Sequence, residues 1–241
     1  MSHADAAATY LRVTMHVAST AQFDKLLRRA AYAADEHRGR ARARVPLNLL
    51  DIGAGSGEVT AELAAALKLP TSAITAMEAS EPLRRRLKAS GYALSPGFEE
   101  LRPQSFGAVS LLNVLDRCDA PRSLLQSALR MLHPNGVLLV ATVLPFCAKV
   151  YEGVKGEFDA KRDPRQPLSL PAGYRCRDPP ARFEMQSAAF AASVFRPLNL
   201  QVSAWTCASP WVSNPIRRER APLRRGSLTL YNSRVARART L

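Results

Sequence analysis

Glycines and acidic residues are interleaved in the segment Asp51-Ile52-Gly53-Ala54-Gly55-Ser56-Gly57-Glu58, which directly follows an apolar run. Glycines at such a junction let the backbone turn tightly and approach a ligand closely. A helix that begins there also presents N–H groups to that ligand. The segment therefore predicts a binding site for a nucleotide-like cofactor.

The spacing of these residues distinguishes between kinds of cofactor. A dinucleotide fingerprint has its third glycine at position 58, where a pyrophosphate meets the helix. Glu58 stands there, and its carboxylate would repel a pyrophosphate, whereas acidic neighbours tolerate the sulfonium of S-adenosylmethionine. Asp51 adds negative charge, and Glu78, after the apolar run 73–77, can accept hydrogen bonds from two ribose hydroxyls. S-adenosylmethionine is the predicted cofactor; an NAD-type site or a tight turn without a ligand is the alternative.

A second polar group, Asn113 and Asp116, follows the apolar run 106–112. Methyltransferases of adenine or glutamine amines carry Asn/Asp-Pro-Pro-aromatic at this point, and that motif is absent. Cytosine C5 chemistry needs a cysteine that commonly follows proline, whereas Cys118 follows Arg117. Two interpretations stay open: the amide and carboxylate face the donor's methyl group, or Asn113 closes the strand and Asp116 caps the next helix.

The elements that would position these residues alternate between strands and helices. Periodicity, caps and turn residues predict helix 21–36, strand 46–52, helix 59–67, strand 73–78, a helix capped by Ser80, strands 92–94 and 106–112, helix 121–132 capped by Asp119, a turn at 133–136, strand 136–143, helix 181–195, and strands 199–206 and 226–231. This order predicts an α/β fold of the Rossmann-like class, a doubly wound and mostly parallel sheet with an antiparallel edge strand. Ligands of such sheets bind at the carboxyl ends of the strands.

The length of 241 residues suits one domain. Its expected parts are an N-terminal helical extension (1–45), a cofactor-binding core (46–146), a lid or insert (147–180), and a C-terminal helix with edge strands (181–241). Charged residues and prolines fill 149–180, which is therefore predicted to be a long loop without regular structure.

Composition limits the partners and the compartment. The net charge is +14, and nearly all of the excess positive charge comes from arginine. The chain is also rich in alanine and proline, and GC-rich genomes impose this combined bias. The basic charge is therefore weak evidence for nucleic-acid binding, and nucleic acid is not an expected partner. The basic segment 217–225 lacks interleaved aromatic residues and is expected to be a solvated loop, with attraction of acidic substrates or membranes as the alternative. No cysteine pair has the spacing of a metal site, so we expect no bound metal. No apolar run is long enough to cross a membrane, and we expect a cytoplasmic protein. We also expect a monomer, with reduced thiols at Cys118, Cys147, Cys176 and Cys207.

Three segments resemble the methyltransferase-like protein nine family, also called DREV: LDIGAGSGEVT at 50–60, NVLDRCDAP at 113–121 and VLPF at 143–146. The similarity extends from Phe23 to the last predicted strand. It implies a class I S-adenosylmethionine-dependent methyltransferase that acts as a protein-histidine N-methyltransferase. Members of the family form N-pros (1-)methylhistidine in His-x-His motifs of target proteins, so such proteins are the implied partners.

The resemblance also implies the roles of individual residues. Asn113 and Asp116 would be catalytic and contact the target imidazole, and Arg117 and Trp211 would contact the substrate. Trp211 stands where relatives carry tyrosine, so this chain keeps an aromatic wall but loses a hydroxyl. The cofactor would be held by Asp51, Gly53, Ala54, Gly55, Glu78, Ala79, Glu99 and Asn113.

The chemistry of imidazole makes these roles reasonable. Neutral histidine has a pKa near ~6.5, so one ring nitrogen already offers a lone pair at neutral pH. If Asp116 accepts the N–H of the far (tele) nitrogen, the near (pros) nitrogen carries the lone pair, and the same carboxylate stabilises the developing imidazolium. The alternatives are an RNA or small-molecule methyltransferase, which the basic charge favours, and a methyltransferase-fold scaffold without activity.

Overall fold

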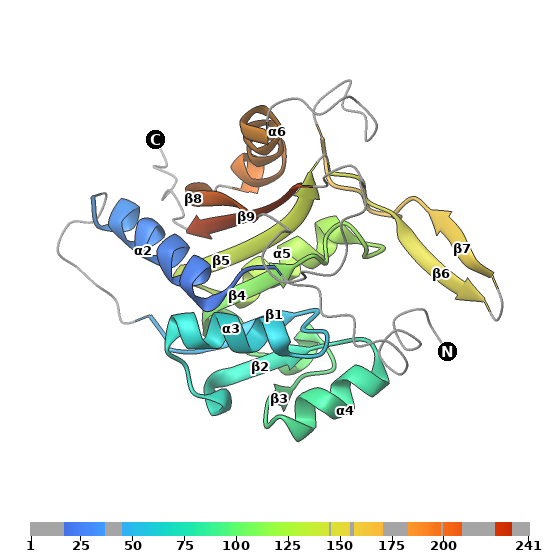
Figure 1. The fold of residues 1–241 in the computed structure, drawn as a ribbon, viewed down its shortest axis with the longest axis horizontal. Coiled ribbons are helices and arrows are strands. Elements are labelled where there is room, and N and C mark those ends of the chain that lie inside the picture. The colour runs from blue at the N-terminus through green and yellow to red at the C-terminus, as the bar shows by residue number, and fades with distance from the viewer. Residues whose placement is uncertain are drawn as a thin grey trace, which may run out of the picture.

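The computed structural model describes residues 17–36, 45–144, 146–154, 157–170, 183–198, 200–208 and 225–232. The strands of these residues form a seven-stranded sheet in the order β3-β2-β1-β4-β5-β9-β8 (Figure 1). Five neighbouring strands are parallel: β3 (Ala93–Leu94), β2 (Ile74–Met77), β1 (Leu49–Ile52), β4 (Phe106–Leu112) and β5 (Leu132–Leu144). β9 (Arg225–Asn232) lies antiparallel between β5 and β8 (Gln201–Ala208). The predicted fold class is confirmed.

Two apolar cores lie on opposite faces of this sheet, because successive residues of a strand point in opposite directions. Leu49 packs in one core with α2 (Thr20–Glu36) and α3 (Glu58–Leu67). Leu50 packs in the other with α5 (Pro121–Met131) and with Phe190 of α6 (Phe183–Phe190). β4 is buried along its whole length, as expected for a parallel strand that is covered on both faces.

Short elements complete the described fold. Helix α4 (Glu81–Ala89) begins after Ser80, as predicted, and follows the end of β2. Three-residue 3-10 turns lie at Thr71–Ala73 and Phe98–Glu100. Beyond α6 the chain continues in a π-helical turn, Ala191–Phe195, and a 3-10 turn, Arg196–Leu198. No helix within the described ranges is long and apolar enough to cross a membrane.

The strand register brings the three polar segments of the sequence together. Ile52 at the end of β1 pairs with Met77 on β2 and with Leu111 on β4. The glycine loop, Glu78 and Asn113 each follow one of these three strands. They consequently emerge at one edge of the sheet, which is where ligands of open parallel sheets bind.

The predicted turn at 133–136 is wrong, because β5 already begins at Leu132 and runs through these residues. Leu132 pairs with Phe106 and Val137 pairs with Ala108, so residues 133–136 bulge opposite the single residue Gly107. The local turn signals are real, but pairing with β4 continues on both sides of them.

The prediction of a loop throughout 149–180 is also wrong. β6 (Val150–Val154) and β7 (Glu157–Arg162) pair as an antiparallel hairpin that extends away from the main sheet (Figure 1). β7 contains Glu157, Asp159 and Lys161, residue types that are depleted in strands generally, so residue preferences gave this strand a weak signal.

Candidate active site

The glycine loop that follows β1 has a backbone that needs its glycines. Gly53, Gly55 and Gly57 have φ angles of 75°, 59° and 87°, in the left-handed region that side chains with a Cβ disfavour. The N–H groups of Gly53 and Ala54 both donate to the carbonyl of Met77, at 2.8 and 3.2 Å. A Cβ on Gly53 would lie 2.5 Å from Cγ2 of Val114, so the loop after β4 packs directly on this glycine.

Open space and negative charge meet at Gly55. A Cβ placed there would have no atom within 4 Å, so a ligand has room against this backbone. The Gly55 N–H donates to Oε2 of Glu78 at 2.8 Å, and the Ser80 N–H donates to Oε1 at 2.9 Å. Each carboxylate oxygen can accept a second hydrogen bond, so half-buried Glu78 can still receive ribose hydroxyls.

Asp51 lies beneath this loop, with 2% of its surface exposed. Thr60 on α3 donates its hydroxyl to Oδ2, and Ser110 on β4 donates its hydroxyl to Oδ1, both at 2.6 Å. Burial raises the pKa of Asp51, and the Glu78 charge adds to the rise, while the bonds from Ser110 and Thr60 oppose it. The buried side chain thus joins β1, α3 and β4 and supports the loop from below.

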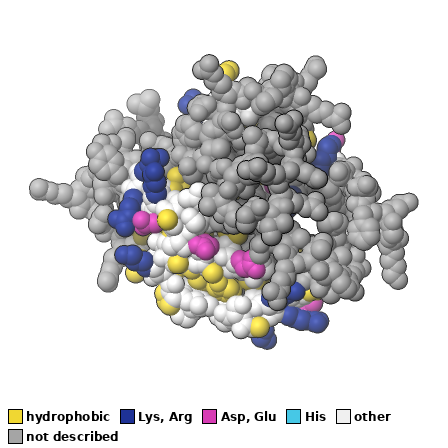
Figure 2. Space-filling model, in the orientation of Figure 1, with side chains coloured by type: hydrophobic (Ala, Val, Ile, Leu, Met, Phe, Trp, Pro, Cys, Tyr) yellow, Lys and Arg dark blue, Asp and Glu magenta, His cyan; other side chains and the backbone are white. Residues whose placement is uncertain are grey.

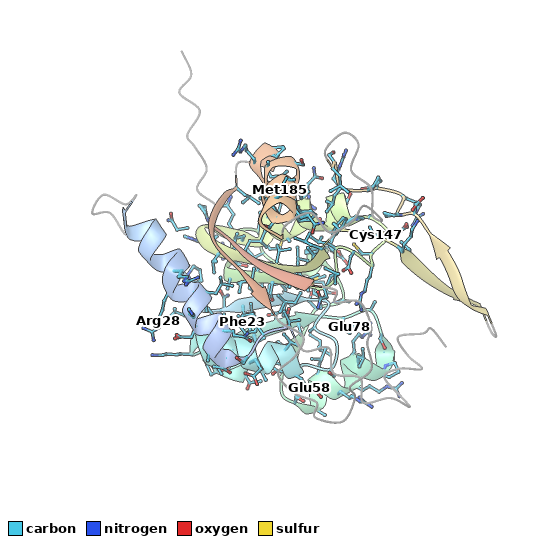
Figure 3. The ribbon with its side chains drawn as sticks, turned by 45° about the horizontal axis from the view of Figure 1, so that its top comes forward. Phe23, Arg28, Glu58, Glu78, Cys147 and Met185 are labelled. Atoms are coloured by element: carbon cyan, nitrogen blue, oxygen red, sulfur yellow. The ribbon has the colours of Figure 1, made fainter. Side chains whose placement is uncertain are left out.

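Three further residues that the sequence associates with the cofactor are exposed. Glu58 begins α3, and Ala79 follows Glu78. Exposed Glu99 folds back over Gly97, where its Oε1 lies 2.1 Å from the position of a Cβ. Figure 3 shows Glu58 and Glu78 on the half of the molecule that holds α3 and α4, and Figure 2 shows acidic side chains near the middle of the described surface, with Lys and Arg toward its edges.

Asn113 ends β4 in a left-handed conformation. Its φ of 56° is uncommon for a residue with a side chain, although asparagine tolerates it better than most. Its N–H donates to the Ala141 carbonyl at 2.9 Å, which keeps the strand end attached to β5 while the chain turns into the loop 113–120. Strained residues of this kind concentrate at functional sites.

Asp116 carries a buried carboxylate oxygen without a hydrogen-bond partner among the described residues. Its side chain is 12% exposed, and its Oδ2 lies 3.7 Å from Nε of Arg117. Oδ1 is buried, and no described residue donates a hydrogen bond to it. A buried acceptor left in this state costs roughly 1–3 kcal/mol, which a donor on a bound molecule would recover.

The helix-cap interpretations of this segment are wrong. Helix α5 starts at Pro121, with Ala120 in the N-cap position and without a side-chain cap. Asp119, the predicted cap, instead pairs with Arg165, and Asp116 lies further from the helix start. Of the other two predicted substrate contacts, Arg117 is exposed beside Asp116, and Trp211 lies outside the described residues.

A hollow of about 240 Å³ borders the same loop and was not foreseen from the sequence. Burial raises the pKa of the Cys118 thiol in its wall to about 11, so this cysteine is a neutral thiol and a poor nucleophile. The lining residues are Phe98, Cys118, Ala120, Ser123, Leu124 and Ser127.

The prediction of four reduced thiols is wrong for Cys147, which is disulfide-bonded, whereas Cys118 is a free thiol. Figure 3 places Cys147 beside the root of the β6–β7 hairpin. In the described part of the chain, no group of three or more His, Cys, Asp or Glu side chains is placed to hold a metal ion.

Several solved structures are similar to this chain. A protein described as a methyltransferase, bound to the Trm112 methyltransferase activator of Haloferax volcanii, is 13% identical, with 97% of this chain and 98% of that chain covered and a TM-score of 0.54. An S-adenosylmethionine-dependent methyltransferase from Mesorhizobium loti is 14% identical, with 84% and 97% covered and a TM-score of 0.49. The DhpI–SAH complex is 16% identical, with 95% and 93% covered and a TM-score of 0.48.

The order of the strands and the likeness to the first of these structures show the fold of class I methyltransferases. The chain belongs to the DREV methyltransferase family, whose model matches residues 1–214. This confirms the family resemblance, the fold and S-adenosylmethionine as the methyl donor of the class.

Cys118 and Cys147 should differ in their reaction with iodoacetamide. Cys147 should be alkylated only after reduction, and Cys118 without reductant but about tenfold more slowly than an unperturbed thiol near pH 8, because a raised pKa depletes the thiolate. Mass spectrometry of proteolytic peptides measures both. Alkylation of Cys147 before reduction would contradict the disulfide.

Asp51→Asn should change the pH dependence of stability. Because burial raises the folded-state pKa above the ordinary 3.8, Asp51 contributes stability that is fully present below that value and is lost as pH rises through the folded pKa. Asparagine does not titrate, so the variant should gain stability relative to the native protein as the pH rises above the ordinary value of 3.8. Urea unfolding at several pH values measures the free energy of unfolding of both proteins. A difference between them that does not change with pH would refute the effect.

Proposed function

We propose that this methyltransferase methylates histidine in His-x-His segments of proteins and forms N-pros methylhistidine. The observation that carries the proposal is the buried Oδ1 of Asp116, to which no described residue donates a hydrogen bond. An imidazole N–H is a donor of the required kind. The family resemblance of the loop 113–121 supports the same acceptor.

The donor side of the proposal rests on the glycine loop. S-adenosylmethionine supplies a methyl group activated by a sulfonium cation. The space above Gly55 and the carboxylate of Glu78 suit its backbone contact and its ribose hydroxyls, and the negative charge of Glu78 suits its cation. Gly53, Ala54, Ala79 and Glu99 stay proposed contacts. For Asp51 we propose support of the loop in place of direct contact, because its side chain is buried under it.

The acceptor side depends on which imidazole nitrogen keeps its proton. Asp116 accepts the N–H of the far nitrogen and so leaves the lone pair of the near nitrogen for the methyl group. That lone pair forms the new N–C bond while the S–C bond breaks, with its electron pair passing to sulfur. Asp116 then stabilises the methylated imidazolium until its far-nitrogen proton is lost to water.

Asn113 is proposed to orient the ring or the adjacent peptide. Its left-handed backbone lies at the junction between β4 and the loop 113–120, which we call the acceptor loop. The next residue, Val114, packs against Gly53 of the glycine loop. Arg117 and Trp211 are proposed contacts for the rest of the peptide. Transfer then depends mainly on positioning, which oriented sites supply in large measure.

Gly55→Ala should weaken binding of S-adenosylmethionine by at least about tenfold while the protein still folds, because the methyl group would fill the ligand's space and the positive φ costs only roughly 1–2 kcal/mol. Gly91→Ala is the matched control. It has a φ of 84° and only an ordinary contact with Thr71, so it should lose similar stability and keep its affinity. Calorimetric titration measures both, and unchanged affinity of Gly55→Ala would contradict this donor site.

Asp116→Asn should lower methyl transfer to an Ala-His-Ala-His peptide by about a hundredfold or more, because the amide presents a donor as well as an acceptor to the ring. Binding of S-adenosylmethionine should stay unchanged. Mass spectrometry that separates the two methylhistidine isomers, with labelled donor, measures the product.

Asp24→Asn, an exposed change on α2, is the control and should keep full activity. Labelled RNA with unlabelled peptide would replace the proposal by RNA methylation, which the charge of +14 would favour. Retained peptide activity in Asp116→Asn would show that the carboxylate does not select the tautomer.

A further inference from the structure

A stretch of chain beyond the hairpin, residues 163–169, is fastened to the loop that carries Asp116. The Arg165 backbone N–H donates to Oδ1 of Asp119 at 3.1 Å, and the Arg165 guanidinium pairs with Oδ2. The Gln166 N–H donates to the Asp119 carbonyl at 3.2 Å. We call the contacts of Arg165 and Gln166 with Asp119 the clasp.

The same stretch caps helix α5. The Gln166 carbonyl accepts the Arg122 N–H at 3.3 Å, and the Gln166 side chain is bonded to the Ser123 hydroxyl. Arg122 also donates through Nη2 to the hydroxyl of Ser169 at 2.7 Å. The Gln166 carbonyl thus satisfies a backbone N–H at the start of α5, and the two side-chain bonds, between residues 43 and 47 positions apart, hold the stretch against the helix.

An apolar side chain holds the clasp in place. Leu168 is 8% exposed and packs in the core that contains Leu125 of α5 and Phe146. The stretch 163–169 is therefore fixed to the body of the protein, although the Arg165 side chain itself is 81% exposed.

The other end of the hairpin reaches Asp116 itself. The Lys149 N–H donates to the Asp116 carbonyl at 2.9 Å, and the Lys149 ammonium pairs with Asp163. Both legs of the β6–β7 hairpin are thus attached to the loop 113–120, one at Asp116 and one at Asp119.

A carboxylate oxygen that is buried without a donor needs such attachments. Left unrestrained, a loop outside regular structure would turn Asp116 so that Oδ1 meets water, because water would supply the missing hydrogen bond. One exposed ion pair stabilises a loop only weakly, but the stretch 163–169 adds backbone bonds to Asp119, a cap on α5 and the buried side chain of Leu168.

We propose that Asp119 and Arg165 are positioning residues, which hold the acceptor loop so that Oδ1 of Asp116 stays buried and aimed at the substrate. The proposal rests on the proposed function of Asp116. It assigns Asp119 a role distinct from both helix capping and substrate contact, and it makes the hairpin legs part of the acceptor site.

The test compares Arg165→Gln with Arg85→Gln in the full-length protein. Arg85 forms an exposed ion pair with Glu81 on α4, away from the acceptor loop, so its loss is a matched control. Arg165→Gln should lower kcat for the Ala-His-Ala-His peptide about tenfold, with S-adenosylmethionine affinity unchanged, because a small misplacement of an acceptor group is costly. Arg85→Gln should keep the native kcat.

Amide hydrogen exchange supplies a readout that does not need activity. The N–H groups of Arg117 and Cys118 both donate to the Val114 carbonyl, so loosening of the loop should speed their exchange in Arg165→Gln and not in Arg85→Gln. The double variant Asp119→Arg with Arg165→Asp should restore part of the lost kcat and part of the lost protection from exchange, whereas Asp119→Arg alone should not.

The outcomes separate this proposal from the proposed function. If the native protein leaves the peptide unmethylated, the histidine proposal fails, and the exchange of Arg117 and Cys118 alone decides whether the clasp holds the loop. Unchanged exchange in Arg165→Gln would overturn the clasp. Faster exchange with an unchanged kcat would overturn its positioning role and leave it a purely structural contact.

Discussion

The buried carboxylate of Asp51 is the constraint on which the site depends. It accepts hydroxyl hydrogen bonds from α3 and β4 while standing on β1, so it fixes the three elements whose ends hold the donor loop and the acceptor loop. A buried carboxylate is costly unless it is hydrogen-bonded, and two short bonds in an apolar surrounding are strong.

The acceptor loop stores strain that the surrounding structure must hold. Asn113 has a positive φ, and Asp116 keeps an oxygen buried without a donor among the described residues. Such features persist only where neighbouring structure determines them. Here β4 is packed on both faces, and the stretch 163–169 grips the far end of the loop through Asp119 and Leu168.

Predictions from the sequence were most accurate where a local pattern carries the structural signal. β4 was predicted to the residue, because a strand buried on both faces is a continuous apolar run. α3 begins one residue before its predicted start. The start of β5 and the hairpin were missed, because partner strands overrode turn signals in one case and poor strand preferences in the other.

The sequence by itself determined the features of the proposed donor site. The apolar strand, the glycines that permit left-handed turns and the acidic residues at strand ends are all patterns of neighbouring residues. Only the tertiary structure decided that Asp51 joins β1 to α3 and β4, that Asp119 pairs with Arg165 while Gln166 caps α5, and that Asp116 buries an oxygen to which no described residue donates. The contacts of Asp51 with Ser110 and of Asp119 with Arg165 join residues 59 and 46 positions apart. No local pattern encodes such pairs, because they arise only when strand register and helix packing bring distant segments together.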